Sequence, residues 1–184
     1  MKMLSIVSDK KASLRKKSVE IRFPLEKYIV DLAHKMREHL INSQNLSFLE
    51  KHPKVRTGVG LAAPQIGKNI RMFAIYFEID ENEKYDFVLV NPKIVKRSST
   101  PSYLSGGEGC LSVDTDHPGY VVRSSAISIS AFDVISNKQI SLNLEGYPSI
   151  VFQHEYDHLD GILFYDRINK ENHFNELEGA VVID

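Results

Sequence analysis

The stretch that decides the fold is YPSIVFQHEYDHL, residues 147–159. When it is built as a helix, one side carries Ile150, Val151, His154 and His158. Gly161, just beyond it, is a typical helix stop. Because the two histidines of this HExxH pattern are four residues apart, both imidazoles can reach one metal ion, with Glu155 beside it. The stretch therefore predicts a metal-binding helix able to support amide hydrolysis.

The segments upstream of this helix predict one further helix and several strands. Apolar residues recur at helical spacing from Leu25 to Leu40 after Pro24, which predicts an N-terminal amphipathic helix, and the polar residues 41–57 predict a frayed helix end followed by a loop. Strands are expected over residues 70–79, 87–90, 93–97, 126–132 and 140–144, with a loop over 98–107 and the last two strands paired as a hairpin. A short surface helix is expected over residues 169–178.

Helix, strands, helix and tail in this order predict an α+β fold, with antiparallel sheets packed around the central metal-binding HExxH helix. The 184 residues are 42% hydrophobic, a size and composition suited to a single catalytic domain over residues 1–184. The 23 basic and 24 acidic residues leave a net charge of -1, which argues against binding to nucleic acid or to an anionic membrane. One cysteine cannot form an internal disulfide, and no apolar run is long enough to span a bilayer. We therefore expect a soluble cytoplasmic protein.

A catalytic metal usually has three protein ligands, so the two histidines require a third. The acidic and histidine residues after His158 do not fit the extended HExxHxxGxxH spacing. Cys110 is the alternative, and the glycines at 106, 107 and 109 would let the backbone around it come close to another group. Two histidines can also share this spacing by accident, but the apolar flanks of the helix make unpaired imidazoles costly there.

The sequence resembles the peptide deformylases, enzymes that remove the formyl group from N-formylmethionine at the start of new bacterial proteins. The resemblance rests on three motifs in the family's order: GVGLAAPQ at 58–65, EGCLS at 108–112 and QHEYDHL at 153–159. It extends over about residues 14–168. The longer spacers and the Gly146-Tyr147-Pro148 run are similar to the form typical of Gram-positive bacteria.

The resemblance implies a complete catalytic site. Its metal ligands would be Cys110, His154 and His158. Glu155 would be the general base and then the general acid, while the Gln65 side-chain amide and the Leu111 N–H would stabilise the oxyanion. Intrinsic affinity for two imidazoles and a thiolate favours zinc over ferrous iron. The resemblance instead implies Fe2+ as the working metal, with Zn2+, Ni2+ or Co2+ as substitutes.

The implied substrates are N-formylmethionyl peptides and nascent chains, met close to the ribosome and cleaved with release of formate. An extended peptide could bond to backbone groups near Gly60 and Gly109. Val59, Ile150 and Val151 are candidates to line a methionine pocket, although ordinary core packing explains each of them equally well. Two other functions stay open: a HExxH metallopeptidase that cleaves internal peptide bonds, and a metal-stabilised binding module without turnover.

Overall fold

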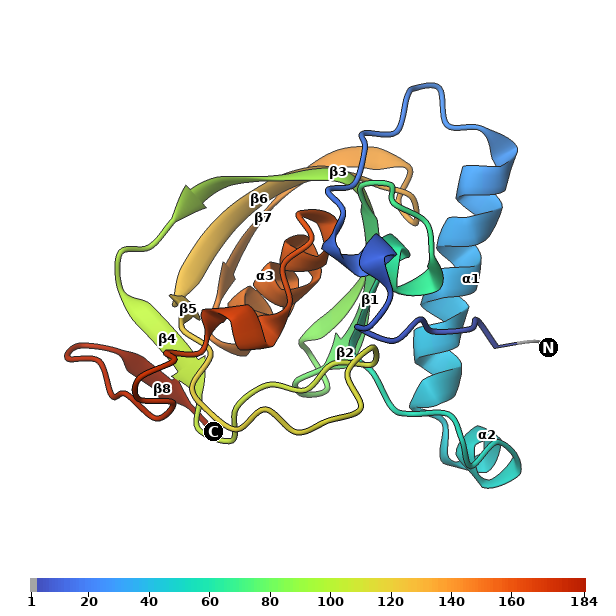
Figure 1. Cartoon of the computed structure of the whole chain (residues 1–184). Helices are drawn as coiled ribbons and strands as arrows, with labels where there is room; N and C mark the ends of the chain where they lie inside the picture. The colour runs from blue at the N-terminus through green and yellow to red at the C-terminus, as the bar shows by residue number, and fades with distance from the viewer. Residues whose placement is uncertain (1–2) are drawn as a thin grey trace.

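The structure is a computed structural model that describes residues 3–184. Its helices are α1 (Lys27–Ser43), α2 (Leu46–Lys51) and α3 (Tyr147–Leu159), with 3-10 helices at Ala12–Arg15, Ala63–Ile66 and Phe164–Arg167. Its strands are β1 (Gly60–Ala62), β2 (Met72–Glu78), β3 (Lys84–Arg97), β4 (Pro101–Leu104), β5 (Arg123–Ser124), β6 (Ala126–Asp133), β7 (Lys138–Glu145) and β8 (Val181–Ile183). The fold is α+β, and its strands curve around α3 (Figure 1).

Two sheets organise the strands. The larger has the order β1-β2-β3-β6-β7, and every neighbouring pair in it is antiparallel. The smaller has the order β5-β4-β8, and its β4–β8 pair is parallel, which departs from the purely antiparallel expectation. β1 therefore lies at the edge of the larger sheet, next to α3.

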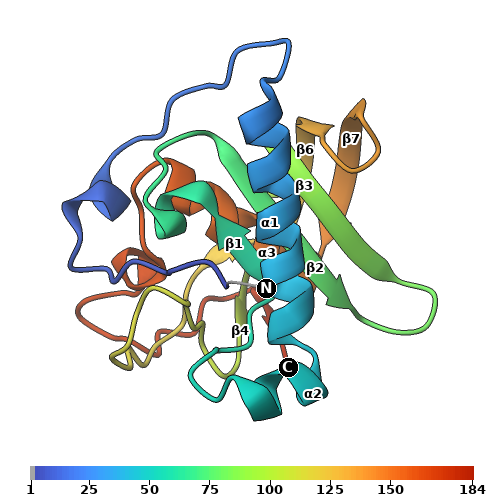
Figure 2. The same ribbon diagram turned by 90° about the vertical axis from the view of Figure 1, so that its right-hand side faces the viewer.

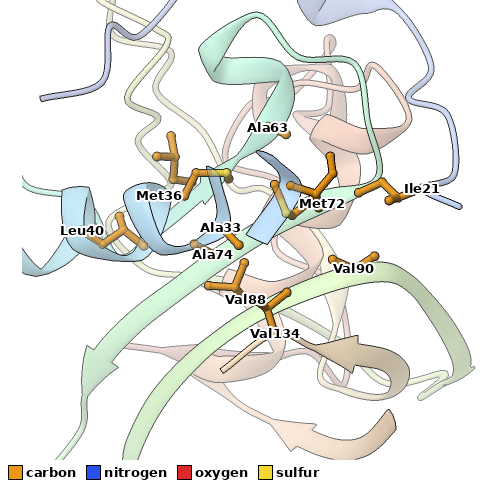
Figure 3. Close-up of a cluster of buried hydrophobic side chains, with 12 residues drawn as sticks. Ile21, Ala33, Met36, Leu40, Ala63, Met72, Ala74, Val88, Val90 and Val134 are labelled. Carbon is orange, nitrogen blue, oxygen red and sulfur yellow. The ribbon is translucent and has the colours of Figure 1, made fainter. Parts of the chain in front are cut away.

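Strand β2 is buried on both faces because α1 and α3 cover opposite sides of the sheet (Figure 2). Successive side chains of a strand point to opposite faces. Met72 and Ala74 accordingly join the apolar cluster under α1, whereas Phe73 and Ile75 join the cluster under α3. Figure 3 shows the α1 side, where the helix residues Ala33, Met36 and Leu40 lie over Ala74 and Val88. The continuous apolar run of β2 thus separates two layers.

The predicted hairpin is confirmed: β6 and β7 pair in antiparallel register, with Ala131 opposite Ile140. Along β6, buried and half-buried residues alternate, as expected for a strand with one face on the core. Ile127 and Ile129 are buried in the cluster under α3. The hairpin therefore extends the layer that covers this helix.

Three upstream predictions were wrong in detail. The strands expected at 87–90 and 93–97 form the single strand β3, because Asn91, in left-handed backbone geometry, makes a bulge that the ladder passes through. The loop expected at 98–107 contains β4, which gains pairing from the distant β5 and β8. Residues 41–57 do include the expected helix end, since α1 runs to Ser43, but the loop expected after it contains α2, whose first turn is capped by the Asn45 side chain.

The surface helix expected over residues 169–178 was also wrong. This segment is irregular, with bends and turns and no helix: the Asn169 side chain accepts hydrogen bonds from the backbone N–H groups of Glu171 and Asn172. The His173 carbonyl accepts a hydrogen bond from the N–H of Tyr120, which is distant in sequence. Both contacts compete with helical hydrogen bonding.

Helix α3 lies between the two sheets and follows directly from β7. Gly146 precedes it with a positive φ of 64°, and Gly161 follows with a φ of 75°, so both chain reversals use backbone geometry that favours glycine. At Gly161 a Cβ atom would also meet the Arg15 carbonyl oxygen at 2.5 Å. None of the helices within residues 3–184 has both the length and the apolar character needed to cross a bilayer.

Candidate active site

Cys110, His154 and His158 converge on one point. Their ligand atoms all lie within 4.8 Å of one another, and the Cys110 Sγ atom is 3.3 Å from His158 Nε2. The histidines share a face of α3 because they are one turn apart, and Cys110 reaches them from the loop that follows β4. Within residues 3–184 this is the one cluster of three such side chains with donor atoms close enough for a metal ion.

Glu108 determines which nitrogen of His154 carries a proton. Its Oε2 atom lies 2.8 Å from His154 Nδ1. Burial alone would raise the pKa of Glu108, but Arg123 and His154 outweigh it and lower the pKa to about 2. The carboxylate is therefore ionised and accepts from Nδ1–H. Burial would lower the pKa of His154, but Cys110 and Glu108 outweigh it and raise that pKa well above its ordinary value, so a metal ion at Nε2 would have to displace a proton.

A buried charge network supports this carboxylate. The Arg123 guanidinium donates two hydrogen bonds to Glu108, at 2.6 and 2.8 Å, and one to Asp157 at 2.8 Å. Asp157 lies on α3 between the two histidines and also accepts two bonds from Arg167. The sequence reasoning assigned no role to these residues. Glu108 stood in a recognised motif, but its partner is fifteen residues away and no local pattern indicated the pairing.

Glu155 is buried, and its Oε2 atom has no hydrogen-bond partner among the described residues. Burial, opposed in part by His154 and Arg123, raises the pKa of Glu155 to about 7. Gly60 packs directly against this side chain: a Cβ atom there would lie 2.3 Å from Glu155 Oε1. A carboxyl group with a pKa near neutrality can both accept and return a proton.

Gln65 and Leu111 present N–H groups near the cysteine. The Gln65 Oε1 atom accepts from the Ala62 N–H at 2.7 Å, and its Nε2 atom lies 3.5 Å from Cys110 Sγ. The side-chain amide is thus oriented with its donor toward the cysteine. The Leu111 N–H donates to no acceptor within residues 3–184, so it is available to a bound molecule.

A pocket of about 470 Å³ opens beside these groups. Of the predicted site residues, all but His158 line it: Val59, Gly60, Gln65, Gly109, Cys110, Leu111, Ile150, Val151, His154 and Glu155. His158 is buried and does not line the pocket. The wall also includes Arg56, Leu104 and Tyr147, which the sequence reasoning did not select because nothing local marks them as neighbours of the motifs.

The donor set fits a divalent transition metal. Burial, strengthened by His154 and Arg123, lowers the pKa of His158 well below its ordinary value, so this imidazole is neutral. A cysteine sulfur and two neutral imidazole nitrogens are typical ligands of zinc and of similar divalent ions. The His158 Nδ1 atom has no partner within residues 3–184.

The chain is similar to proteins of one known family. The sequence profile of the polypeptide deformylase family matches residues 3–174. The peptide deformylase of Listeria monocytogenes serotype 4b is 48% identical over 170 residues, which cover 92% of each chain.

Two solved structures are similar to the chain as well. A probable peptide deformylase from Synechococcus phage S-SSM7 is 35% identical with a TM-score of 0.72, and the match covers 89% of this chain and 99% of that one. The Met-Ala-Ser-bound deformylase of Acinetobacter baumannii is 26% identical with a TM-score of 0.72, over 91% and 99% of the two chains. The chain therefore belongs to the polypeptide deformylase family, metal-dependent hydrolases that remove the N-formyl group from newly made polypeptides.

Proposed function

We propose that Cys110, His154 and His158 hold the metal ion of this deformylase. The observation that carries the proposal is the approach of their donor atoms to within 4.8 Å of one another beside the pocket. When bound, a divalent ion supplies Lewis acidity and makes hydroxide available near neutral pH. The reaction is hydrolysis of the formyl amide at an N-terminal formylmethionine, with release of formate.

Glu155 is proposed to move the protons. Its unpartnered Oε2 atom is free to accept a proton from the attacking water, and the same carboxyl then delivers that proton to the leaving amine. Its pKa of about 7 supports both directions of transfer. Gly60 leaves the room that this side chain occupies.

The developing oxyanion is proposed to be bound by the Gln65 side-chain amide and the Leu111 N–H. Preorganised donors of this kind contribute most when they are held before the reaction begins. The Gln65 Oε1 atom is already held by the Ala62 N–H, and the Leu111 N–H has no competing acceptor within the described part of the chain.

The peptide is proposed to bind as an additional strand. β1 lies at the edge of the larger sheet, and Gly60, which begins it, lines the pocket together with Gly109. Addition of an extended peptide to such an edge uses backbone hydrogen bonds and tolerates many side chains. At Gly109 a Cβ atom would meet nothing within 4 Å, so this stretch leaves room for a neighbouring chain.

Val59, Ile150 and Val151 are proposed to receive the methionine side chain. All three line the pocket, and Ile150 and Val151 do so while almost wholly buried from solvent. An apolar wall beside the reacting amide would favour an unbranched thioether side chain. The Acinetobacter relative, whose bound peptide begins with methionine, supports a pocket of this kind.

Fe2+ is proposed as the working metal, with Zn2+, Ni2+ and Co2+ as substitutes. The ligand chemistry admits all four ions. Anaerobic loading of metal-free protein with each ion, followed by turnover measurements, tests the choice. Equal turnover with zinc and iron, together with full survival of the iron form in air, would rule out the preference for iron.

The working context is proposed to be the cytoplasm, close to the ribosome, with the whole chain acting as one catalytic domain. Formylmethionine is carried by nascent chains, so the substrate becomes accessible where these chains emerge. The near-neutral net charge of -1 provides no general attraction to RNA, so any ribosome contact would be local.

The decisive experiment is formate release from formyl-Met-Ala-Ser by anaerobically purified protein, with metal analysis of the same sample. We expect about one metal ion per chain and turnover that a chelator abolishes. Cys110→Ala should lose both the metal and the activity. Retention of metal and formate release by this variant would rule out Cys110 as a ligand. Retained metal with cleavage of internal peptide bonds in place of formate release would instead favour the metallopeptidase with a downstream ligand, a reading that the family match does not support.

A further inference from the structure

The segment from Cys110 to Val113 forms a four-residue turn. The Val113 N–H donates to the Cys110 carbonyl at 3.1 Å and closes it. Leu111 occupies the second position, where the N–H of a turn takes no part in its internal bond. The orientation of this turn therefore sets the direction of the Leu111 N–H and the position of the Cys110 sulfur.

Arg56 holds both ends of the turn. Its Nη2 atom donates to the Cys110 carbonyl at 2.7 Å, and its Nη1 atom donates to the Val113 carbonyl at 3.1 Å. Arg56 stands in the segment that leads into Gly58, more than fifty residues before the turn. Its contact with Asp114 is longer, at 3.3 Å, and the Asp114 side chain is 83% exposed, so this ion pair adds little.

The remaining contacts hold the turn less completely. The Asp9 N–H donates to the Ser112 carbonyl at 2.8 Å, and the Ser112 N–H lies 3.5 Å from Cys110 Sγ. No other side chain within residues 3–184 donates to the carbonyl of Cys110. The Val113 side chain is also buried in an apolar cluster. Loss of Arg56 would therefore leave the turn formed and attached at Ser112 and Val113, but with no side chain holding the Cys110 carbonyl.

We propose that Arg56 is a positioning residue that keeps Cys110 and the Leu111 N–H aligned for the reaction. The proposal rests on the metal and oxyanion roles proposed above. A planar guanidinium can bridge two carbonyl oxygens with separate N–H groups, whereas a lysine ammonium acts as a point charge. The charge of residue 56 alone would therefore not replace its function.

The test compares Arg56→Met and Arg56→Lys with the wild type and with Arg37→Met. Arg37 makes a bidentate pair with Asp86 at 2.6 and 2.5 Å, away from the pocket, so its loss controls for the removal of an arginine pair. Each protein is loaded with Co2+, and the thiolate-to-cobalt absorption band is recorded beside kcat and KM for formyl-Met-Ala-Ser. Thermal melting verifies that each variant is folded.

Both Arg56 variants should lose about tenfold to 10²-fold in kcat with little change in KM, because donors are misplaced and not removed. The cobalt band should shift in both variants, and Arg37→Met should change neither quantity. A rise in KM with normal kcat and an unshifted band would overturn the proposal and make Arg56 a substrate contact. An unchanged Arg56→Met enzyme would overturn it as well.

The wild-type measurements show separately whether the proposed metal site itself is wrong. If the wild-type protein gives no thiolate band with Co2+, or releases no formate, the proposed metal site fails independently of Arg56. If the wild type behaves as proposed and Arg56→Lys retains normal kcat and an unshifted band, only the positioning role is wrong. Should Arg56→Met not fold, Arg56→Lys keeps the comparison, because it retains length and charge.

Discussion

The two faces of the larger sheet hold opposite kinds of helix. α1 covers one face with an apolar layer in which Met36 and Leu40 are fully buried against β2 and β3. α3 covers the other face and buries polar groups, among them Glu155, Asp157 and His158. Burial of polar side chains is costly unless they are paired. Both faces bury an apolar cluster, and the α3 face in addition buries a network of charged groups beside the pocket.

Exceptions on each face sharpen the contrast. On α3, the Glu155 Oε2 atom and the His158 Nδ1 atom lack partners within residues 3–184, whereas Asp157 is fully paired. α1 also carries a buried polar group without a hydrogen-bond partner: His39 is buried, and its Nδ1 atom has no partner in the described chain. Substitution of these unpaired groups therefore tests what each face contributes to activity and to stability.

The largest effect is expected from Glu155→Ala. Removing a general acid and base should lower kcat by about 10²- to 10⁴-fold. The melting temperature should stay the same or rise, because an unpartnered buried carboxyl is lost. Formate release and metal content of the same preparation provide the measurement. Normal metal content with normal kcat would remove Glu155 from the mechanism.

Glu108→Gln should weaken both the fold and the metal site. Breaking a buried ion pair by removing one charge costs about 3–5 kcal/mol, and loss of a carboxylate that orients a ligand histidine lowers metal affinity by about 10- to 100-fold. Chemical denaturation and competition with a chelator measure the two quantities.

Asp86→Asn is the matched control on the α1 face. It weakens the ion pair between Asp86 and Arg37, in which the Arg37 side chain is 31% exposed and the Asp86 side chain 19% exposed. The free energy of unfolding should therefore fall by about 1 kcal/mol or less. Its metal affinity should be that of the wild type. Equal losses of stability and of metal affinity in Glu108→Gln and Asp86→Asn would contradict the stated difference between the two faces.

Leu40→Ala tests the apolar layer under α1. The side chain is fully buried, and its truncation should cost about 2–5 kcal/mol of unfolding free energy. At a temperature where the variant is folded, kcat and KM should equal those of the wild type. A large fall in kcat of the folded variant would mean that α1 also shapes the pocket across the sheet.

The smallest effect is expected from His39→Leu and depends on pH. Burial lowers the pKa of His39 below its ordinary value. The folded state therefore binds fewer protons, and its stability, present above the unfolded pKa of about 6.5, is lost as the pH falls. His39→Leu should reduce the decline in melting temperature between about pH 7 and pH 5. An identical decline in melting temperature in the wild type and in His39→Leu would mean that other titratable groups cause it.

Local pattern predicted those parts of the fold in which neighbours in sequence are neighbours in space. The hairpin of β6 and β7 is an example, since alternation and a short turn specify its partners. The bulge in β3 and the short strand β4 were missed because each depends on distant segments: the Asn91 side chain bonds the backbone of Ile21, and β4 pairs with β8.

The site shows the same division. The spacing of His154 and His158 is a local property of a helix, and the motif around Cys110 could be recognised as it stood. The residues around these groups could not be predicted, because Glu108 meets His154 across 46 positions and Arg56 meets Cys110 across 54. No periodicity encodes such contacts.

The sequence by itself determined the kinds of groups available, the helical spacing of two imidazoles about a carboxylate, and the resemblance to a family. Only the tertiary structure decided that a cysteine 44 residues upstream of His154 reaches both histidines, and that Glu108 and Arg123 are paired beneath them. The physical reason is that spacing along a helix follows from backbone geometry, whereas the approach of a loop to that helix follows from packing of the whole chain.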